Sequence, residues 1–155
     1  MPAKFWSDQV AAMMEREAVA SEREAAIQQL RDVGLRVTSP RLEVLQVLGS
    51  GEHLDVEALT AKARERLGTL TSQAVYEMLR HFLETGLVTK FDRPGSTAVF
   101  EIAGDPHQHA LCVNCGRVEN VEYENPTPPR KGLRGWRMDA AEVVFKGTCP
   151  ECRKA

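Results

Sequence analysis

Apolar residues recur every three to four positions across the first half of the chain, a pattern that predicts amphipathic helices. Ser21 with Glu24 forms a capping-box pattern, so we expect a helix to start or restart at Ser21, and Ser39 is expected to cap a later helix. The predicted helices cover residues 7–20, 21–33, 39–48, 55–67 and 71–84. Their apolar faces are expected to contain Val10, Met13, Met14, Ala18, Ala25, Ile27, Leu30, Val33, Leu42, Val44, Leu45, Leu48, Val56, Leu59, Ala63, Val75, Leu79, Phe82 and Leu83.

The hydrophobic period then changes from 3.6 to 2, which is typical of strands. Residues 87–91 and 97–101 alternate in this way, and the turn-forming run 93–96 lies between them. This pattern predicts a β-hairpin. Several short helices followed by one hairpin is the order of a winged helix-turn-helix, which we assign to residues 1–103.

A break near residues 103–106 opens a second unit, residues 104–155, whose pattern is strand-like. A unit of about fifty residues is too small to depend on an apolar core alone and usually needs a cross-link or a metal. All four cysteines of the chain lie in it. The expected fold class is therefore α+β, with an N-terminal winged helix and a small C-terminal α/β unit stapled by a metal.

The cysteines form two Cys-x-x-Cys pairs, Cys112 with Cys115 and Cys149 with Cys152, separated by 33 residues. A two-residue gap lets both sulfurs of a pair point at one ion, and Gly116 tolerates the positive φ that such a turn favours. Two pairs complete a closed tetrahedral thiolate site, which predicts structural Zn(II). The alternative is a pair of thiol–disulfide switches.

His107 and His109 alternate by two, so on a strand both imidazoles project from one face. Glu101, at the end of the hairpin, can bring a carboxylate to the same region. His53 could be a fourth member, although spacing alone favours a loop histidine hydrogen-bonded at a helix start. The geometry favours a metal site separate from the cysteines. The alternative, which an isolated His-x-His pair favours, is a surface motif that binds no metal.

A series of motifs in this order resembles the ferric uptake regulator family. The likeness covers roughly residues 30–153, and residues 71–76 and 94–96 resemble its peroxide-sensing and catalase-controlling branch most. The motifs lie at residues 34–41, 53, 73–79, 86–88, 107–116 and 149–152.

The resemblance implies a homodimeric, metal-dependent repressor of double-stranded DNA operators that are palindromic and AT-rich. It implies a regulatory Fe(II) or Mn(II), replaceable in vitro by Zn(II), between the two units at His53, Glu101, His107 and His109. The family's fifth ligand, usually acidic, falls on Asn120 here, and Glu122 is a possible substitute. The implied role is peroxide-responsive control of oxidative-stress or metal-homeostasis genes; the alternative is an iron- or manganese-uptake regulator without peroxide sensing.

Two further departures concern the second unit. A histidine of an additional family metal site falls near Ala141, so that site is expected to be absent. The usual dimerisation helix is also doubtful because residues 124–130 contain too many prolines. Dimerisation is then expected to rest on a strand over residues 142–146 and on the N-terminal extension.

Residues 71–84 would enter the DNA major groove as the recognition helix. Gln suits adenine, Tyr suits thymine methyls or phosphate, and Arg suits guanine or phosphate. The alternative is an ordinary solvated helix face, and Glu77 weakens the pattern. The candidate DNA contacts are Arg36, Ser72, Gln73, Tyr76, Arg80 and Lys90, with Arg93 as a further backbone contact from the wing.

Charge argues against unaided DNA binding. The 155-residue chain carries 20 basic and 22 acidic side chains, and residues 1–103 carry 12 and 15. Global attraction to phosphate is missing, so the metal-free form should bind DNA poorly. No apolar run approaches the roughly 18–20 residues of a membrane helix, and we expect a cytoplasmic protein.

Two other classes compete with a repressor. A His-His-Glu site with an open position could be hydrolytic zinc, but the sequence has no nucleophile motif or phosphate-binding loop beside it, so we expect no enzyme. A zinc-ribbon interaction module without a DNA target is the second alternative.

Overall fold

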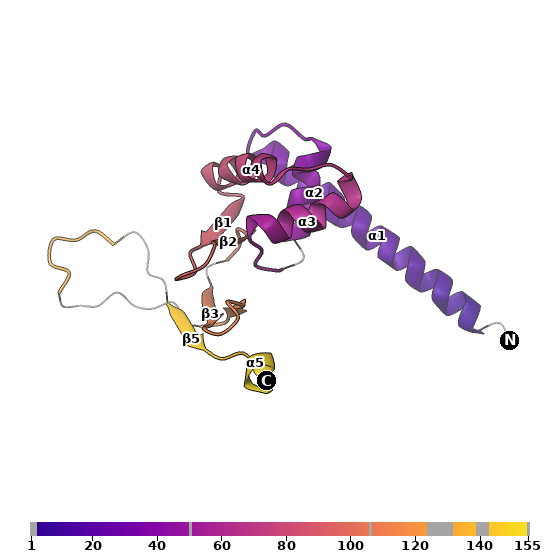
Figure 1. The fold of residues 1–155 in the computed structure, drawn as a ribbon. Helices are drawn as coiled ribbons and strands as arrows, with labels where there is room; N and C mark the ends of the chain where they lie inside the picture. The colour runs from indigo at the N-terminus through magenta and orange to yellow at the C-terminus, as the bar shows by residue number, and fades with distance from the viewer. Residues whose placement is uncertain (1–2, 50, 106, 124–131, 139–142, 155) are drawn as a thin grey trace.

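The computed structural model describes residues 3–49, 51–105, 107–123, 132–138 and 143–154, and places helices first and strands after them (Figure 1). The hairpin lies between the helices and the second sheet. The elements are α1 (Ala3–Asp32), α2 (Ser39–Leu48), α3 (Val56–Leu67), α4 (Ser72–Glu84), β1 (Val88–Phe91), β2 (Val99–Ile102), β3 (Gln108–Cys112), β4 (Val118–Val121), β5 (Val144–Gly147) and α5 (Pro150–Lys154).

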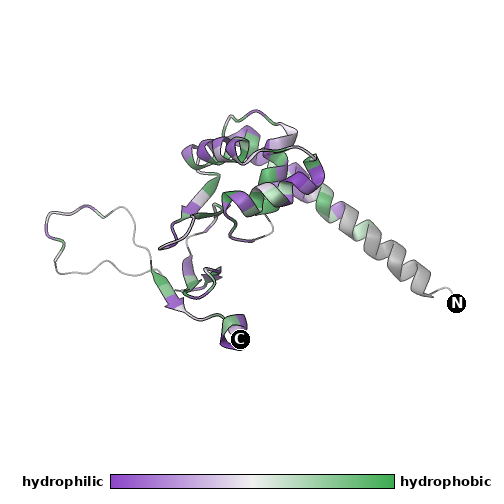
Figure 2. Ribbon diagram, in the orientation of Figure 1, coloured by the Kyte–Doolittle hydropathy of each residue, from purple (hydrophilic) through white to green (hydrophobic). Residues whose placement is uncertain are grey.

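Helix α1 differs from the prediction, because it runs through Ser21 without a break. A capping-box sequence inside a run of good helix formers does not by itself start a new helix. The C-terminal end of α1 packs on the body, where Leu30 is fully buried. The helix before this end projects away from the body (Figure 1), in which α2 and α3 carry apolar residues, green in Figure 2. The predicted apolar stripe is wrong for Met13, Met14 and Ala18, which are exposed; Val10 lies outside the described side chains.

Side-chain caps fix where the next three helices begin. The oxygen of Thr38 accepts from the N–H of Arg41, so Thr38 caps α2 in place of the predicted Ser39. Asp55 caps α3 through a 2.9 Å bond from the N–H of Ala58, and Thr71 caps α4. Each cap satisfies an N–H that the helix itself cannot pair.

The first core lies between these helices and the hairpin. The predicted apolar faces of α2 and α4 are confirmed except that Leu83 is half-buried, and Met78 joins them. Ala26 replaces Ala25 as the buried alanine of α1. The largest fully buried apolar side chains of this core are Leu30, Val44, Leu45, Leu48, Leu59, Val75, Leu79 and Phe82.

The two sheets share a second, smaller core. Strands β1 and β2 pair antiparallel, and the other sheet has the order β4-β3-β5, with β3 antiparallel to β4 and parallel to β5. Phe91 and Val99 of the hairpin pack with Leu111 and Val118 of the second sheet. The hairpin therefore contacts helices on one side and the second sheet on the other. Residues 124–130 and Ala141 lie outside the described residues, and the expected strand is observed over Val144–Gly147.

Leu30→Ala tests how α1 is anchored. Removing this fully buried side chain should lower the free energy of unfolding by about 2–5 kcal/mol, because a cavity is left between α1 and the core. Met14→Ala, in the same helix but 62% exposed, should change it by no more than about 0.5 kcal/mol. Denaturant unfolding measures both, and an equal loss for Met14→Ala would show that the projecting part of α1 is packed in solution.

Candidate metal centres

Strand β2 places Glu101 in the interior of the molecule. The two residues that precede it, Val99 and Phe100, are buried as well, because both faces of the strand are covered. Glu101 is only 8% exposed, and Thr89 of the paired strand donates a 3.2 Å hydrogen bond to Oε1. The carboxylate is thus fixed by the hairpin register before any histidine contacts it.

A short backbone bridge brings His53 to this carboxylate. Leu54 and Phe100 exchange both N–H···O bonds, at 3.1 and 2.8 Å, so residues 53–55 run beside β2. His53 Nε2 then lies 3.1 Å from Glu101 Oε2. His53 therefore lies in the loop before α3, as spacing alone favours, but its partner is Glu101, which spacing did not predict.

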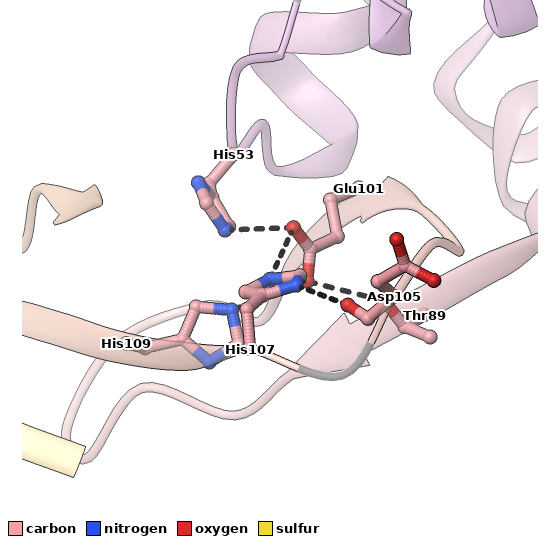
Figure 3. Close-up of polar contacts among 6 residues, drawn as sticks. All are labelled: His53, Thr89, Glu101, Asp105, His107 and His109. Atoms are coloured by element: carbon pink, nitrogen blue, oxygen red, sulfur yellow. Dashed lines mark hydrogen bonds and ion pairs between the residues drawn. The ribbon is translucent and has the colours of Figure 1, made fainter. Parts of the chain in front are cut away.

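Two more imidazoles complete the cluster, as Figure 3 shows. His109 Nε2 lies 3.1 Å from Oε1 of Glu101, and His107 Nε2 lies 3.1 Å from both carboxylate oxygens. His109 lies in β3, whereas His107 directly precedes this strand. The ligand atoms of the four side chains all lie within 4.8 Å of one another. Three imidazoles and one carboxylate thus surround one point.

The tautomer of His107 shows that this point suits a cation. Its Nδ1 lies 2.9 Å from the backbone carbonyl of Asp105, which can only accept, so Nδ1 carries the proton and donates. In a neutral imidazole, Nε2 is then an acceptor that faces the acceptor oxygens of Glu101. A second proton or a bound metal ion at Nε2 removes this conflict, and the Asp105 carbonyl is the outer partner that commonly orients a metal-bound histidine.

The pKa shifts favour the protonation states that a metal needs. Burial raises the pKa of Glu101, but the hydrogen bond and charge of His53, with the charges of the other two histidines, outweigh it and lower this pKa to about 2. Burial also lowers the pKa of His109, opposed by its contact with Glu101. Near neutral pH the carboxylate is ionised and His109 is neutral.

Asn120 occupies a position from which a fifth ligand could reach the cluster. It pairs directly with His109 across β3 and β4, so the two side chains share a face of the sheet. Asn120 also lines a cavity of about 420 Å³ with Glu101 and His107. Glu122 lies beyond the end of β4, is exposed, and is not among the four clustered side chains.

The four cysteines meet in a second cluster, with all sulfurs within 4.8 Å of one another. The parallel pairing of β3 with β5 sets Cys112 beside Gly147, which brings the two Cys-x-x-Cys segments together. Gly116 has φ of +74° and its N–H donates to the carbonyl of Cys112, as the first turn requires. All four are free thiols.

The close approach of four sulfur atoms also makes this cluster suitable for a cation. The N–H of Cys149 donates to Cys112 Sγ at 3.3 Å and is the largest cause lowering the pKa of Cys112 to about 6. Side-chain hydrogen bonds with Cys149 and Cys115 raise the pKa of Cys152 to about 12. Four thiolates so close repel one another unless a cation neutralises them. The donor set fits tetrahedral Zn(II).

The candidate DNA contacts lie apart from both clusters. Gln73, Tyr76 and Arg80 are exposed on α4, and Ser72 is partly exposed at its start. Arg36 is exposed before α2, and Lys90 is exposed on β1, where it pairs with Asp92 at 2.9 Å.

Arg93 does not face outward as predicted. Its side chain is 12% exposed and bonds to Asp55, Thr97 and the carbonyl of Gly116. The position of Arg93 in the hairpin turn did not indicate that its side chain would point toward Asp55 and Gly116. The supporting role of Thr89 at Glu101 was also missed, although the hairpin register places the two residues opposite each other.

A winged helix-turn-helix joined to clusters of metal-binding side chains is typical of transcription regulators that respond to metal ions. The profile of the ferric uptake regulator (Fur) family matches residues 32–138, so the chain belongs to this family of metal-dependent transcription regulators. Its members are DNA-binding regulators, typically dimeric, and not enzymes. In the described part of the chain, no helix is long and apolar enough to cross a membrane.

Curated relatives and solved structures agree with this assignment. The chain is 37% identical over 129 residues to the transcriptional regulator FurA of Mycobacterium tuberculosis, covering 81% of this chain and 88% of the relative. It is 35% identical over 132 residues to the ferric uptake regulation protein of Legionella pneumophila, covering 81% and 97%. The Vibrio cholerae ferric uptake regulator superposes with a TM-score of 0.62 at 28% identity, covering 79% and 98%. The Pseudomonas aeruginosa regulator with manganese superposes with a TM-score of 0.60 at 28% identity, covering 81% and 98%.

His53→Ala tests whether the histidine cluster binds metal. Loss of one of the four clustered side chains should weaken Mn(II) binding by about tenfold or more, measured by calorimetry, and leave the amount of metal bound at the cysteine cluster unchanged. His81→Ala is the matched control, because His81 lies on α4 outside the cluster. Equal Mn(II) affinity in the wild type and both variants would show that the cluster is not a Mn(II) site.

Proposed function

We propose that this chain is a homodimeric repressor in which His53, Glu101, His107 and His109 hold an exchangeable regulatory Fe(II) or Mn(II). The four cysteines hold a structural Zn(II). The observation that carries the proposal is the origin of the ligands: His53 comes from the loop before α3, and the histidine pair comes from the segment that forms β3. One ion at this point ties the helices to the second sheet.

The donor set is compatible with these metals. Imidazole and carboxylate ligands suit iron, manganese and zinc, whereas four thiolates select zinc. The related Pseudomonas aeruginosa regulator was solved with manganese. Asn120 as a fifth ligand would add an oxygen without adding charge, which weakens binding of a hard divalent ion relative to an acidic residue.

The same arrangement supports separate roles for the two units of the chain. Residues 1–103 are the DNA-binding unit and residues 104–155 the dimerisation unit. A dimer presents two copies of α4, and two successive half-sites of a palindromic, AT-rich operator are their expected target. A bound ion favours one orientation of the helices over others. The largest gain in DNA affinity is set by the difference between the ion's binding free energies in the two orientations.

Acidic side chains restrain the exposed face of α4. Arg80 contacts Glu77 at 3.3 Å and Glu84 at 2.7 Å, and Gln73 donates to Glu77. Exposed pairs of this kind are worth at most about 1 kcal/mol, so phosphate or base contacts can replace them. Arg80 and Gln73 are therefore available to DNA, at a modest cost.

Peroxide responsiveness follows if the ion is Fe(II), which supplies the electron that reduces peroxide when bound. Peroxide reaches the ion from the side of His107, because this side chain is 26% exposed and lines the cavity beside Glu101. His53 and His109 are more deeply buried. Oxidation of an imidazole ligand weakens metal binding and releases DNA. The alternative is a metal-uptake regulator, which would occupy the same site without this oxidation.

A mobility-shift assay on the chain's own upstream DNA tests the repressor. Retardation should require Mn(II) and disappear with EDTA. Glu77→Gln should raise the metal-loaded affinity about two- to fivefold, because one surface charge that repels phosphate is removed beside Gln73 and Arg80. Glu119→Gln, with the same charge change on β4, should leave it unchanged. Absence of retardation with every metal would count against the repressor and for an interaction module.

Mass spectrometry after peroxide treatment tests sensing. In the Fe(II)-loaded protein, oxygen addition is expected at His107 and His109, more at His107 because of its greater exposure, together with loss of operator binding. The Mn(II)-loaded protein should remain unmodified. If both histidines of the Fe(II) form stay intact and operator binding persists, the metal-uptake alternative is correct.

A further inference from the structure

Arg93 connects three segments that are distant in sequence. Its Nη1 donates to the carbonyl of Gly116 at 3.0 Å, directly after the first Cys-x-x-Cys pair. Its Nη2 reaches Asp55 Oδ2 at 3.3 Å and Thr97 Oγ1 at 3.1 Å, and its Nε donates to the Thr97 carbonyl at 2.8 Å. One guanidinium therefore joins the cysteine cluster, the hairpin and the start of α3.

The arrangement needs an arginine. A guanidinium presents five N–H donors in a fixed plane, so it can satisfy acceptors on three segments at once, while a lysine ammonium cannot span them. Thr97 reinforces the junction because its hydroxyl donates to Asp55 Oδ2 at 3.1 Å. These contacts, led by the backbone N–H of Ala58, outweigh burial and lower the pKa of Asp55.

Gly116 is matched to Arg93. A Cβ at this position would lie 3.2 Å from Arg93 Nη1, and the residue has a positive φ. The glycine therefore allows both the turn that follows Cys115 and the close approach of the guanidinium. A cavity of about 380 Å³ beside the junction is lined by the hairpin turn and the first cysteine pair.

The Asp55 end of this connection lies next to the histidine cluster. His53 is two residues earlier, and Leu54 between them is fixed to Phe100 by two backbone bonds. Residues 53–55 are thus held at one end by Glu101 and at the other by Arg93. A displacement of the Gly116 turn is transmitted through Arg93 to the segment that carries His53.

We propose that Arg93 is a positioning residue that couples the two metal clusters, so that an ion at the histidines and zinc at the cysteines each strengthen binding of the other. This inference rests on the proposed function. The coupling is reciprocal, because the free energy that links two binding sites is the same in both directions. Arg93 binds neither ion; it fixes the Gly116 turn relative to residues 53–55.

The test uses the full-length, zinc-loaded protein and two readouts, Mn(II) affinity and the rate at which 5,5′-dithiobis(2-nitrobenzoate) modifies the cysteines. In the wild type, saturating Mn(II) should slow cysteine modification by about fivefold or more. In Arg93→Lys the slowing should fall below about twofold, and the Mn(II) affinity should drop by a similar factor although no ligand has changed.

Arg117→Lys is the matched control. Arg117 follows Gly116 directly, but its ion pairs are with Glu119 and Glu151 of the second unit. In Arg117→Lys, Mn(II) should slow cysteine modification as much as it does in the wild type. Thr97→Val is the second variant, because it removes one hydroxyl from the junction and leaves Arg93 and Gly116 in place; it should lose part of the slowing even if Arg93→Lys does not fold.

The outcomes separate the two hypotheses. Mn(II) binding with equal slowing in the wild type, Arg93→Lys and Thr97→Val overturns the coupling and leaves the proposed function standing. Slowing lost equally in Arg117→Lys overturns the specific role of Arg93. A wild type that binds no Mn(II), Fe(II) or Zn(II) at the histidines overturns both.

Discussion

The buried carboxylate of Glu101 is the constraint on which the rest of the structure depends. An ionised group in the interior costs several kcal/mol unless charged or hydrogen-bonding partners surround it. Here the partners are Thr89 and three imidazoles from two segments of the chain. These contacts act together with the Leu54–Phe100 bridge, which holds residues 53–55 against β2, and with the apolar packing between the hairpin and the second sheet.

The hairpin contacts the second sheet as well as the helices. In a winged helix the hairpin is free to lie along DNA, but here Phe91 and Val99 pack on the second sheet and Arg93 turns toward Gly116. Phe91 also contacts the ring of His109, at a centroid separation of 4.7 Å. The wing therefore joins the helices to the candidate metal centres, while Lys90 remains exposed on it.

The sequence predicted best those features that depend on residues near one another in the chain. The apolar faces of α2 and α4 and helix starts near residues 55 and 71 were predicted from spacing, whereas the capping roles of Asp55 and Thr71 were not predicted. The N-cap of α2 was predicted one residue too late, at Ser39, because Thr38 also has a hydroxyl that can accept the hydrogen bond. Direction was harder to predict: whether Arg93 points at DNA or at Gly116 depends on where the second sheet docks, and turn sequence carries no information about that.

The two candidate sites differ in how much of their geometry local sequence spacing determines, and this difference bears on their roles. The cysteine pairs carry their own turn geometry, so spacing alone predicted them, and four thiolates leave no open position on zinc. The histidine site exists only after the Leu54–Phe100 bridge forms, so the resemblance to a family, and not the spacing, led to His53. Three nitrogens and one carboxylate leave room for another ligand, and the cavity beside His107 gives access to it. A closed site within the second unit suits a permanent structural ion; an open site that joins the helices to the second unit suits an ion whose departure changes how those parts are arranged.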